Sequence, residues 1–458
     1  MRSRLTRITI LRATVWIAVG IGSLQGSFRL HLRELEAAPA SGRLTFSRDV
    51  APILFRHCAT CHRPSGPAPF TVLSYEEVRE HARLIVTKTQ SRLMPPWPPQ
   101  PGYGTFTNER RLTVHQIETI RRWVQQGAIE GDRGDLPPQP QFTEGWQLGQ
   151  PDLVVKLPEP FMLPAGGMDV FRNFVIPLAL PATRYVRAVE LRPGNPGFVH
   201  HALVAIDKTR SARRLDSQDP GVGFGGMDLG EAHPPDGQLV VWAPGLVPFV
   251  SNGATAWRLE PGSDLVLQLH MLPSGKPEMI QPSVGFHFAN AAPTGPPLYV
   301  MRLYADAALD ILPGAKNFVV TDTIDVPADI EVLAVHPHAH FLAKTVEAWA
   351  TLPNGTRRWL IRIPEWNFNS QDVYWYAKPI SLPRGTTIRM RYSYDNSADN
   401  VSNPSHPPRR VTAGDRSSDE MAHLSLQVRP RRTEDVALLK ETRFQHSQRA
   451  ESAGHIKP

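Results

Sequence analysis

The stretch Glu331–Lys344, EVLAVHPHAHFLAK, carries a histidine at every second position of its centre. These residues are His336, His338 and His340. In a β-strand, every second side chain points to the same face of the sheet. Read as a strand, the stretch therefore predicts three imidazoles that project in one direction. Because imidazole is a ligand for copper and zinc, this face is a candidate metal site.

The surrounding sequence has the pattern of an all-β protein with many loops. The chain has 458 residues, too many for one ordinary domain, with 45 Pro and 33 Gly. From about Gln150 to Arg429, alternating segments such as RYVRAVEL and TTIRMRYSY stand between turn residues. The segment ANAAPTGPP interrupts this pattern. We therefore predict two tandem antiparallel β-sandwiches, jelly-roll-like, at residues 150–290 and 296–430, without a long helix. We expect a poorly ordered polar tail at residues 431–458.

A Cys-x-x-Cys-His motif precedes the β region and consists of Cys58, Cys61 and His62. In c-type haem attachment, two thiols add to the haem vinyl groups and the adjacent histidine ligates the iron. A redox dithiol or half of a zinc site would be the alternatives. A zinc site needs two further ligands nearby, which are not evident, and a redox dithiol is typical of a βαβ setting, whereas the pattern here is helical. The motif therefore predicts one covalently attached haem c.

The second axial ligand of that haem is expected downstream of the motif. Met94 stands in the Pro-rich segment SRLMPPWPPQPGYG, and His115 is the alternative ligand, while plain core packing is the alternative role for Met94. After it, LTVHQIETIRRWVQQGA predicts a closing helix, with apolar residues Val114, Ile117, Ile120 and Val124 at helical spacing. Residues 43–130 thus resemble a small all-α class I cytochrome c domain, in which His/Met ligation suits electron transfer. Residues 131–148 are Pro-rich and are expected to form a semi-rigid linker.

The N-terminal residues 1–40 have the features of an export signal. MRSRLTR is basic, ATVWIAVGIGSL is a short apolar core, and Ala38–Ala40 matches a signal-peptidase site. We predict a periplasmic or otherwise exported protein, with an uncleaved inner-membrane anchor as the alternative. The formal charge is +7, but these residues carry six Arg against two Glu, which leaves +3 for the rest. Without a Lys/Arg cluster, nucleic acid is not an expected partner.

Histidines recur at two other places in the β region. GFVHHALVAI contains His200 and His201, and LVLQLHMLPSG contains His270, which shares the more polar face of its predicted strand with Asp264. A His-x-His pair on a strand can chelate a metal directly. Adjacent residues on a regular strand diverge, so His200 and His201 would converge only at a bulge or a strand end. Taken singly, each cluster is weak evidence for a metal, because a surface or hydrogen-bonded histidine is the commoner outcome.

The order of four motifs, VHHALV, LQLHMLPSG, HAHFLAK and SSDEM, is more specific than any of them alone. Over residues 150–430 it resembles the copper type II, ascorbate-dependent monooxygenases, which include peptidylglycine α-hydroxylating monooxygenase and dopamine β-monooxygenase. The resemblance implies two copper ions. It assigns an electron-transfer copper to His200, His201 and His270, and an oxygen-binding copper to His338, His340 and Met421. A register that uses His336 with His338 is an alternative, but it fits the following FLAK less well.

The resemblance further implies hydroxylation of a C–H bond in a small-molecule substrate with O2. We expect the fused haem to replace ascorbate and to receive electrons from a periplasmic donor. The positions that hold a peptide carboxylate in the peptide-hydroxylating members are occupied here by His336, His423 and Ser425, so a peptidylglycine substrate is not expected. An electron carrier or redox sensor on a non-catalytic scaffold, or another copper oxidase or reductase, would be the competing functions.

Overall fold

The computed structural model describes residues 42–64, 66–107, 109–142, 145–167, 169–251 and 254–452. The predicted leader at residues 1–40 lies outside these ranges. Within them the chain is mostly β-strand with few helices, which confirms the predicted fold class at that level. No helix of the described residues combines the length and the apolar character that a membrane span requires.

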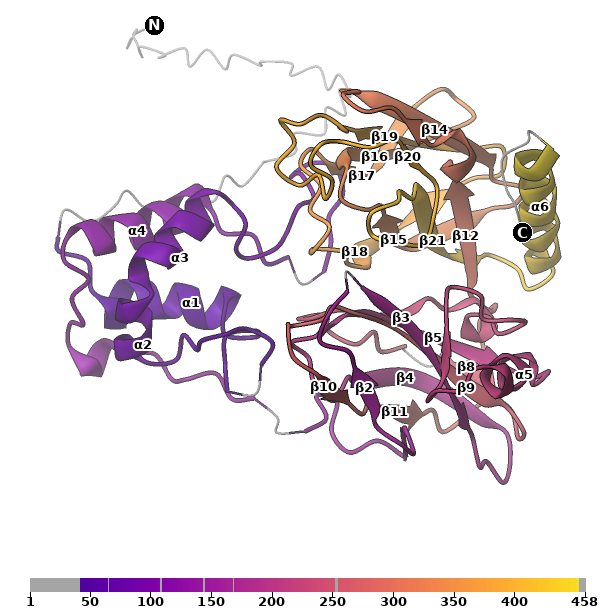
Figure 1. Cartoon of the computed structure of the whole chain (residues 1–458), viewed down its shortest axis with the longest axis horizontal. Helices are drawn as coiled ribbons and strands as arrows, with labels where there is room; N and C mark the ends of the chain where they lie inside the picture. Colours follow the sequence, from indigo (N-terminus) through magenta and orange to yellow (C-terminus); the bar gives the residue numbers. More distant parts are fainter. Residues whose placement is uncertain are drawn as a thin grey trace, which may run out of the picture. The chain divides into compact units, whose positions relative to one another are not determined.

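Residues 42–130 are helical (Figure 1). The elements are η1 (Phe46–Val50), α1 (Ala51–His57), α2 (Tyr75–Glu80), α3 (Ala82–Gln90) and α4 (Val114–Gln125). The predicted closing helix is confirmed as α4, which starts with a capping box between Thr113 and Gln116. Its buried face includes Ile120 and Trp123. Val114, predicted to belong to that face, is instead 69% exposed, because it occupies the first position of the helix.

One loop of this region packs elsewhere. Trp97 and Phe106 are buried in the core of the second β region rather than in the core of the helices. The backbone N–H of Thr107 donates to the carbonyl of Trp375 at 2.8 Å, and Phe106 forms a β-bridge with Tyr376. The segment 97–107 of the predicted domain at residues 43–130 therefore packs against the second β region. The linker that follows contains only the short η2 (Arg133–Asp135) among its described residues.

The first β region contains a four-stranded sheet, β1-β11-β4-β8, and a five-stranded sheet, β6-β3-β9-β5-β7, beside the pair β10-β2. Its elements are β1 (Leu153–Lys156), β2 (Phe161–Leu163), β3 (Val170–Pro177), β4 (Arg184–Arg192), β5 (Val199–Asp207), α5 (Ser211–Gln218), β6 (Phe224–Gly225), η3 (Pro235–Gly237), β7 (Val240–Trp242), β8 (Trp257–Leu259), β9 (Asp264–Met271), β10 (Glu278–Ile280) and β11 (Ser283–Phe288). Leu267 of the larger sheet and Phe286 of the smaller one lie in the same core, and both are fully buried.

Strand β9 differs from the sequence prediction, because all eight of its residues are buried and none lies on an open polar face. Two of the polar side chains on that face, those of Asp264 and Gln268, have hydrogen-bond partners. Arg213 of α5 donates to the Asp264 carboxylate at 2.6 Å, and Gln268 donates its side-chain N–H to Asn173 at 3.0 Å. His270 is consequently an interior residue, 1% exposed, rather than a surface histidine.

The second β region has the sheets β12-β21-β15-β18 and β14-β19-β16-β17 and the pair β13-β20. Its elements are β12 (Tyr299–Tyr304), η4 (Asp306–Ala308), β13 (Asp310–Ile311), β14 (Phe318–Asp325), β15 (Ile330–His338), β16 (Ala343–Thr351), β17 (Arg357–Ile363), β18 (Tyr374–Leu382), β19 (Thr387–Tyr394), β20 (Val411–Thr412) and β21 (His423–Pro430). Leu424 and Met390, one from each sheet, meet in a single core. Every strand pair in the sheets of both regions is antiparallel among the described residues.

The stretch with alternating histidines forms β15, but the strand ends earlier than predicted. His336 and His338 are on the strand, opposite Ser425 and His423 of β21. His340 lies beyond the strand end, at the start of a turn. Two of the three imidazoles therefore follow strand geometry, and the third is placed by the turn.

The C-terminal segment is also ordered, contrary to the expected tail. Residues Asp435–Ser452 form helix α6, which lies beside β12 in Figure 1. Leu439 is 1% exposed and belongs to the core of the second β region. The ring of His446 pairs with the Asp322 carboxylate at 2.9 Å. The apolar contact of Leu439 and the polar contact of His446 thus attach helix α6 to the second β region, although most other residues of the helix are polar.

Candidate functional site

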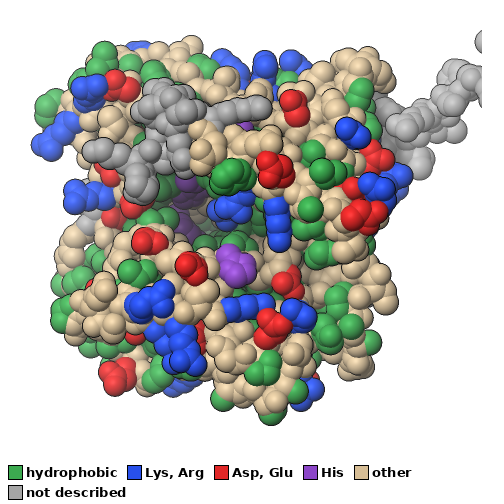
Figure 2. All heavy atoms as spheres, turned by 90° about the vertical axis from the view of Figure 1, so that its right-hand side faces the viewer, with side chains coloured by type: hydrophobic (Ala, Val, Ile, Leu, Met, Phe, Trp, Pro, Cys, Tyr) green, Lys and Arg blue, Asp and Glu red, His purple; other side chains and the backbone are tan. Residues whose placement is uncertain are grey.

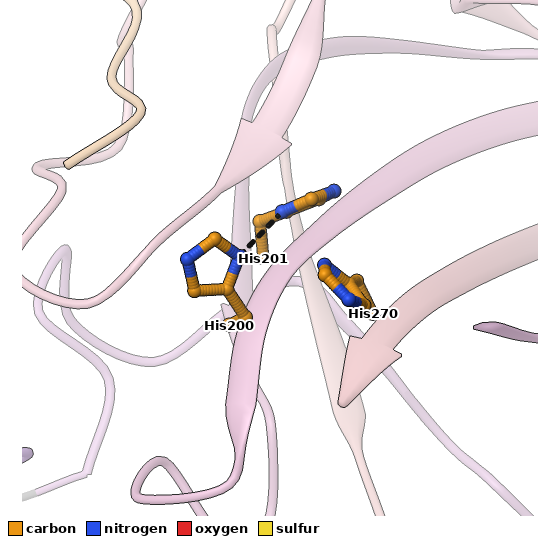
Figure 3. Close-up of side chains that lie close together, drawn as sticks. All are labelled: His200, His201 and His270. Atoms are coloured by element: carbon orange, nitrogen blue, oxygen red, sulfur yellow. Dashed lines mark hydrogen bonds between the residues drawn. The ribbon is translucent and has the colours of Figure 1, made fainter. Parts of the chain in front are cut away.

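The adjacent histidines of β5 converge because the strand is bulged. The pairing of β5 with β9 shifts register between Val199 and His201, so His200 is the extra residue. The Nδ1 atoms of His200 and His201 lie 3.0 Å apart (Figure 3). The prediction that this pair needs a bulge to converge is confirmed.

The third histidine of this cluster comes from the neighbouring strand. His270 of β9 is directly opposite His201, with ring centroids 4.9 Å apart, and Figure 3 shows its ring beside the pair. Its ring stacks on Phe171 at 4.1 Å. Ligand atoms of His200, His201 and His270 all lie within 4.8 Å of one another.

The nitrogen atoms of His270 are the strongest indication of a missing ligand. Both are buried, and neither has a hydrogen-bond partner among the described residues. The Asp169 carboxylate is 3.3 Å from Nε2, but this contact lacks hydrogen-bond geometry. A buried polar group without a partner costs free energy, on the order of 1–3 kcal/mol. A metal ion held by the three histidines would remove that cost, so the residues fit a metal.

Electrostatics favour the neutral form of His200 and His201. Burial lowers the pKa of His200 to about 3, and His270 adds to the shift. Burial, followed by the nearby His270 and His200, lowers the pKa of His201 well below its usual value. Neutral imidazole is the form that ligates metals, so at physiological pH His200 and His201 need not lose a proton before binding.

The second pair, His338 and His340, is oriented by hydrogen bonds on one ring nitrogen each. Nδ1 of His338 donates to the side-chain oxygen of Gln371, and Nδ1 of His340 donates to the carbonyl of Asp419 at 3.1 Å. This arrangement leaves both Nε2 atoms available, which is the usual way in which metal-bound histidines are positioned. Burial lowers the pKa of His340 to about 4 and also lowers that of His338.

Met421 lies close to this pair in the chain fold. It precedes His423 by two residues, and His423 is opposite His338 at the end of β15. Met421 is 7% exposed. The buried Glu420 carboxylate accepts the backbone N–H groups of both His340 and Met421. Burial raises the pKa of Glu420 to about 8, although these N–H groups act in the opposite direction.

His336 belongs to the same face of β15 but not to this end of it. It lies two residues before His338 and faces Ser425 across the sheet. Burial, with Arg302 and His423 nearby, lowers its pKa to about 4. The His-x-His pair that the Asp419 carbonyl and Gln371 orient is therefore His338 with His340.

The two histidine clusters are neighbours. The ring centroids of His201 and His338 are 6.1 Å apart. The Phe368 ring stacks on His200 at 4.7 Å and lies 6.0 Å from the ring of His340. Figure 2 shows a hollow near the centre of one molecular face with histidine side chains inside it. The sequence had not singled out Phe368 or Gln371, since an aromatic and an amide in a loop carry no recognisable pattern.

The Cys-x-x-Cys-His motif lines a cavity of about 290 Å³. Cys58, Cys61, His62 and Met94 contribute to its wall, and so does His200 of the first cluster. Nδ1 of His62 donates to the carbonyl of Phe70 at 3.0 Å, which leaves Nε2 free for a metal. The cavity wall thus contains both thiols and both axial ligands that the haem prediction names.

The thiols themselves do not resemble a redox pair. Burial raises the pKa of Cys58 to about 12, with Cys61 adding to the shift, whereas reactive dithiols have lowered pKa values. Met94 is 44% exposed and lines the cavity, while the alternative ligand His115 is not among the described residues of its wall. The geometry favours Met94 over His115 as the second ligand.

No protein-family model matches the sequence, and no curated protein is similar to it. The resemblance to copper monooxygenases therefore rests on the four motifs and on the arrangement of their residues.

Proposed function

We propose that this chain is an exported copper-dependent monooxygenase that hydroxylates a C–H bond of a small substrate with O2 and receives its electrons through a covalently attached haem. The cytochrome c fold of residues 43–130 and the jelly-roll likeness of the two β regions are part of this proposal. A periplasmic electron donor would be its partner, and residues 1–40 would direct export or anchor the chain.

One observation carries the proposal. Two separate sets of histidines come together beside a cavity that is lined by a Cys-x-x-Cys-His motif. A lone metal site would need only one of the sets, and an electron carrier would need neither. The orphaned nitrogens of His270 and the oriented Nε2 atoms of His338 and His340 support metal binding at both.

Each of the two histidine sets would hold one copper ion. His200, His201 and His270 would hold one copper, and His338, His340 and Met421 the other. Bound copper supplies one-electron redox chemistry and activation of O2, and thioether ligation favours Cu(I) at the second site. Gln371 and the Asp419 carbonyl keep a proton on each Nδ1, so that Nε2 stays aimed at the ligand. Phe368, 4% exposed, fills the space between the two sets and excludes water there.

The haem would be attached through Cys58 and Cys61 and ligated by His62 and Met94. Contacts between the helical region and the two β regions support this part of the proposal. Arg110 donates to the Asp372 carboxylate at 2.7 Å and to the Gly245 carbonyl at 3.0 Å. A β-carbon on Gly245 would stand 2.7 Å from the Cys61 sulfur, so this approach requires glycine.

The proposal is tested by following the oxidation state of the haem. The protein, loaded with copper and reduced, is mixed with O2 and a library of small aliphatic and aromatic substrates, while the haem absorption is recorded and products are analysed with ¹⁸O2. We expect substrate-dependent haem reoxidation and one ¹⁸O atom in the product. Reoxidation without any labelled product would instead favour a copper oxidase. A haem reoxidation rate that does not depend on copper or O2 would favour an electron carrier.

A further inference from the structure

Glu420 occupies an unusual position for a carboxylate. Its side chain is 0% exposed, and no Lys, Arg or His pairs with it within the described ranges. Buried carboxylates are rare unless they are paired or hydrogen-bonded. Its partners must therefore be hydrogen-bond donors of the backbone.

Those donors belong to the residues that form the second histidine site. Oε2 accepts the N–H of His340 at 2.9 Å and that of Met421 at 3.2 Å. Oε1 accepts the N–H of Leu342 at 2.6 Å. A single side chain thus connects the turn after β15 to the segment before β21, which are about 80 residues apart in sequence.

The remaining polar groups of this junction are also fixed. The Trp366 indole donates to the carbonyl of His340 at 3.1 Å, and the Asp395 N–H donates to that of Leu342 at 2.8 Å. The Tyr394 hydroxyl donates to the carbonyl of Met421 at 2.8 Å. The backbone N–H and C=O of all three residues are therefore used, and the N–H groups depend on Glu420 alone.

We propose that Glu420 is a positioning residue of the second metal site, which holds the backbones of His340 and Met421 in the one arrangement that lets both side chains reach the same ion. The inference rests on the proposed function. Removal of such an outer partner typically lowers metal affinity about 10–100-fold. Only a carboxylate offers acceptors on both oxygens, because an amide turns its NH2 group toward at least one of the three N–H donors.

The chain offers a matched control in Glu190. It is 2% exposed and accepts the backbone N–H groups of Gln147 and Leu148, one on each oxygen. Like Glu420, this carboxylate accepts backbone N–H groups in the interior, but it is on β4, which belongs to another sheet than the histidine-bearing strands β5, β9 and β15. Glu190→Gln therefore reports the cost of disturbing a buried carboxylate without touching the metal site.

The test compares wild type, Glu420→Gln and Glu190→Gln as full-length, haem-loaded protein. Copper is titrated as Cu(I) against a competing chelator, and sulfur ligation is followed by X-ray absorption. We expect Glu420→Gln to keep its haem and its first copper but to bind the second copper about 10–100-fold more weakly and to lose the sulfur contribution. Wild-type affinity in Glu420→Gln, or an equal loss in Glu190→Gln, would overturn the inference.

Hydrogen exchange of the metal-free protein separates this inference from the proposed function. The amides of residues 340–342 should exchange faster in Glu420→Gln and at the wild-type rate in Glu190→Gln. Unchanged exchange in Glu420→Gln would overturn the positioning role whether or not copper binds. The wild-type protein could bind no copper while hydrogen exchange in Glu420→Gln is faster as expected. That result would overturn the proposed function and with it the metal part of the inference.

Discussion

At the scale of single residues, the candidate site is defined by what lies behind each imidazole. Nδ1 of His338 and Nδ1 of His340 each donate a hydrogen bond to an oxygen atom. Nδ1 of His62 likewise donates to the Phe70 carbonyl. His270 has no such acceptor, and His200 and His201 turn their Nδ1 atoms toward each other. The first cluster is therefore held by strand register and by a bulge, while the second is held by hydrogen bonds.

This difference predicts that Gln371 controls the second site alone. Gln371→Leu removes the acceptor of His338 Nδ1, so the ring loses its fixed tautomer and orientation. We expect copper affinity at the second site to fall about 10–100-fold, with the first site unchanged, in a chelator titration. Gln281→Leu is the control, because the Gln281 side chain donates to the Leu157 carbonyl and not to a histidine. Loss of both coppers in Gln371→Leu would refute the assignment.

At the scale of elements, sequence patterns located the strands but not what covers them. β15 and β9 were predicted from alternation, and the helix α4 from its apolar spacing. Burial of the polar face of β9 could not be foreseen, because it depends on α5 and on Asn173, which are distant in sequence. The bulge at His200 was named as a requirement, but nothing in VHHALV encodes its position.

Helix α6 shows the same limit, since its residues are polar and only tertiary contact orders them. The adjacent residues Leu438 and Leu439 provide a direct comparison, because they are 46% and 1% exposed. Leu439→Ala should lower the free energy of unfolding of the second β region by about 2–5 kcal/mol. Leu438→Ala should change it by no more than about 0.5 kcal/mol, as for surface substitutions. Equal effects in urea unfolding would mean that α6 does not dock through Leu439.

At the scale of the whole molecule, the account depends on contacts between the helical region and the β regions. The segment 97–107 carries Trp97 and Phe106 into the core of the second β region, which a division of the sequence at Pro-rich stretches could not reveal. Arg110 and Asp372 form a partly buried pair at the same junction, with side chains 18% and 11% exposed. At this junction, the cavity that is lined by the Cys-x-x-Cys-His motif reaches His200.

Breaking the Arg110–Asp372 pair should therefore slow electron transfer without altering the haem. Removing one partner of a buried ion pair typically costs about 3–5 kcal/mol. In stopped-flow experiments, Arg110→Met should reoxidise its haem more slowly with copper and O2 present, while the haem spectrum stays that of the wild type. Arg410→Met breaks an exposed pair with Asp310 and should have no effect. If Arg110→Met reoxidises its haem at the wild-type rate, this junction is not part of the proposed electron path.

The most direct measurement is the number of copper ions and haem groups per chain in protein prepared by an exporting host and reconstituted with Cu(I). The account predicts two coppers and one haem in the wild type, with a single copper remaining in His270→Asn and the haem retained. One haem with no bound copper after reconstitution would contradict it, and would leave the buried nitrogens of His270 to be explained in another way.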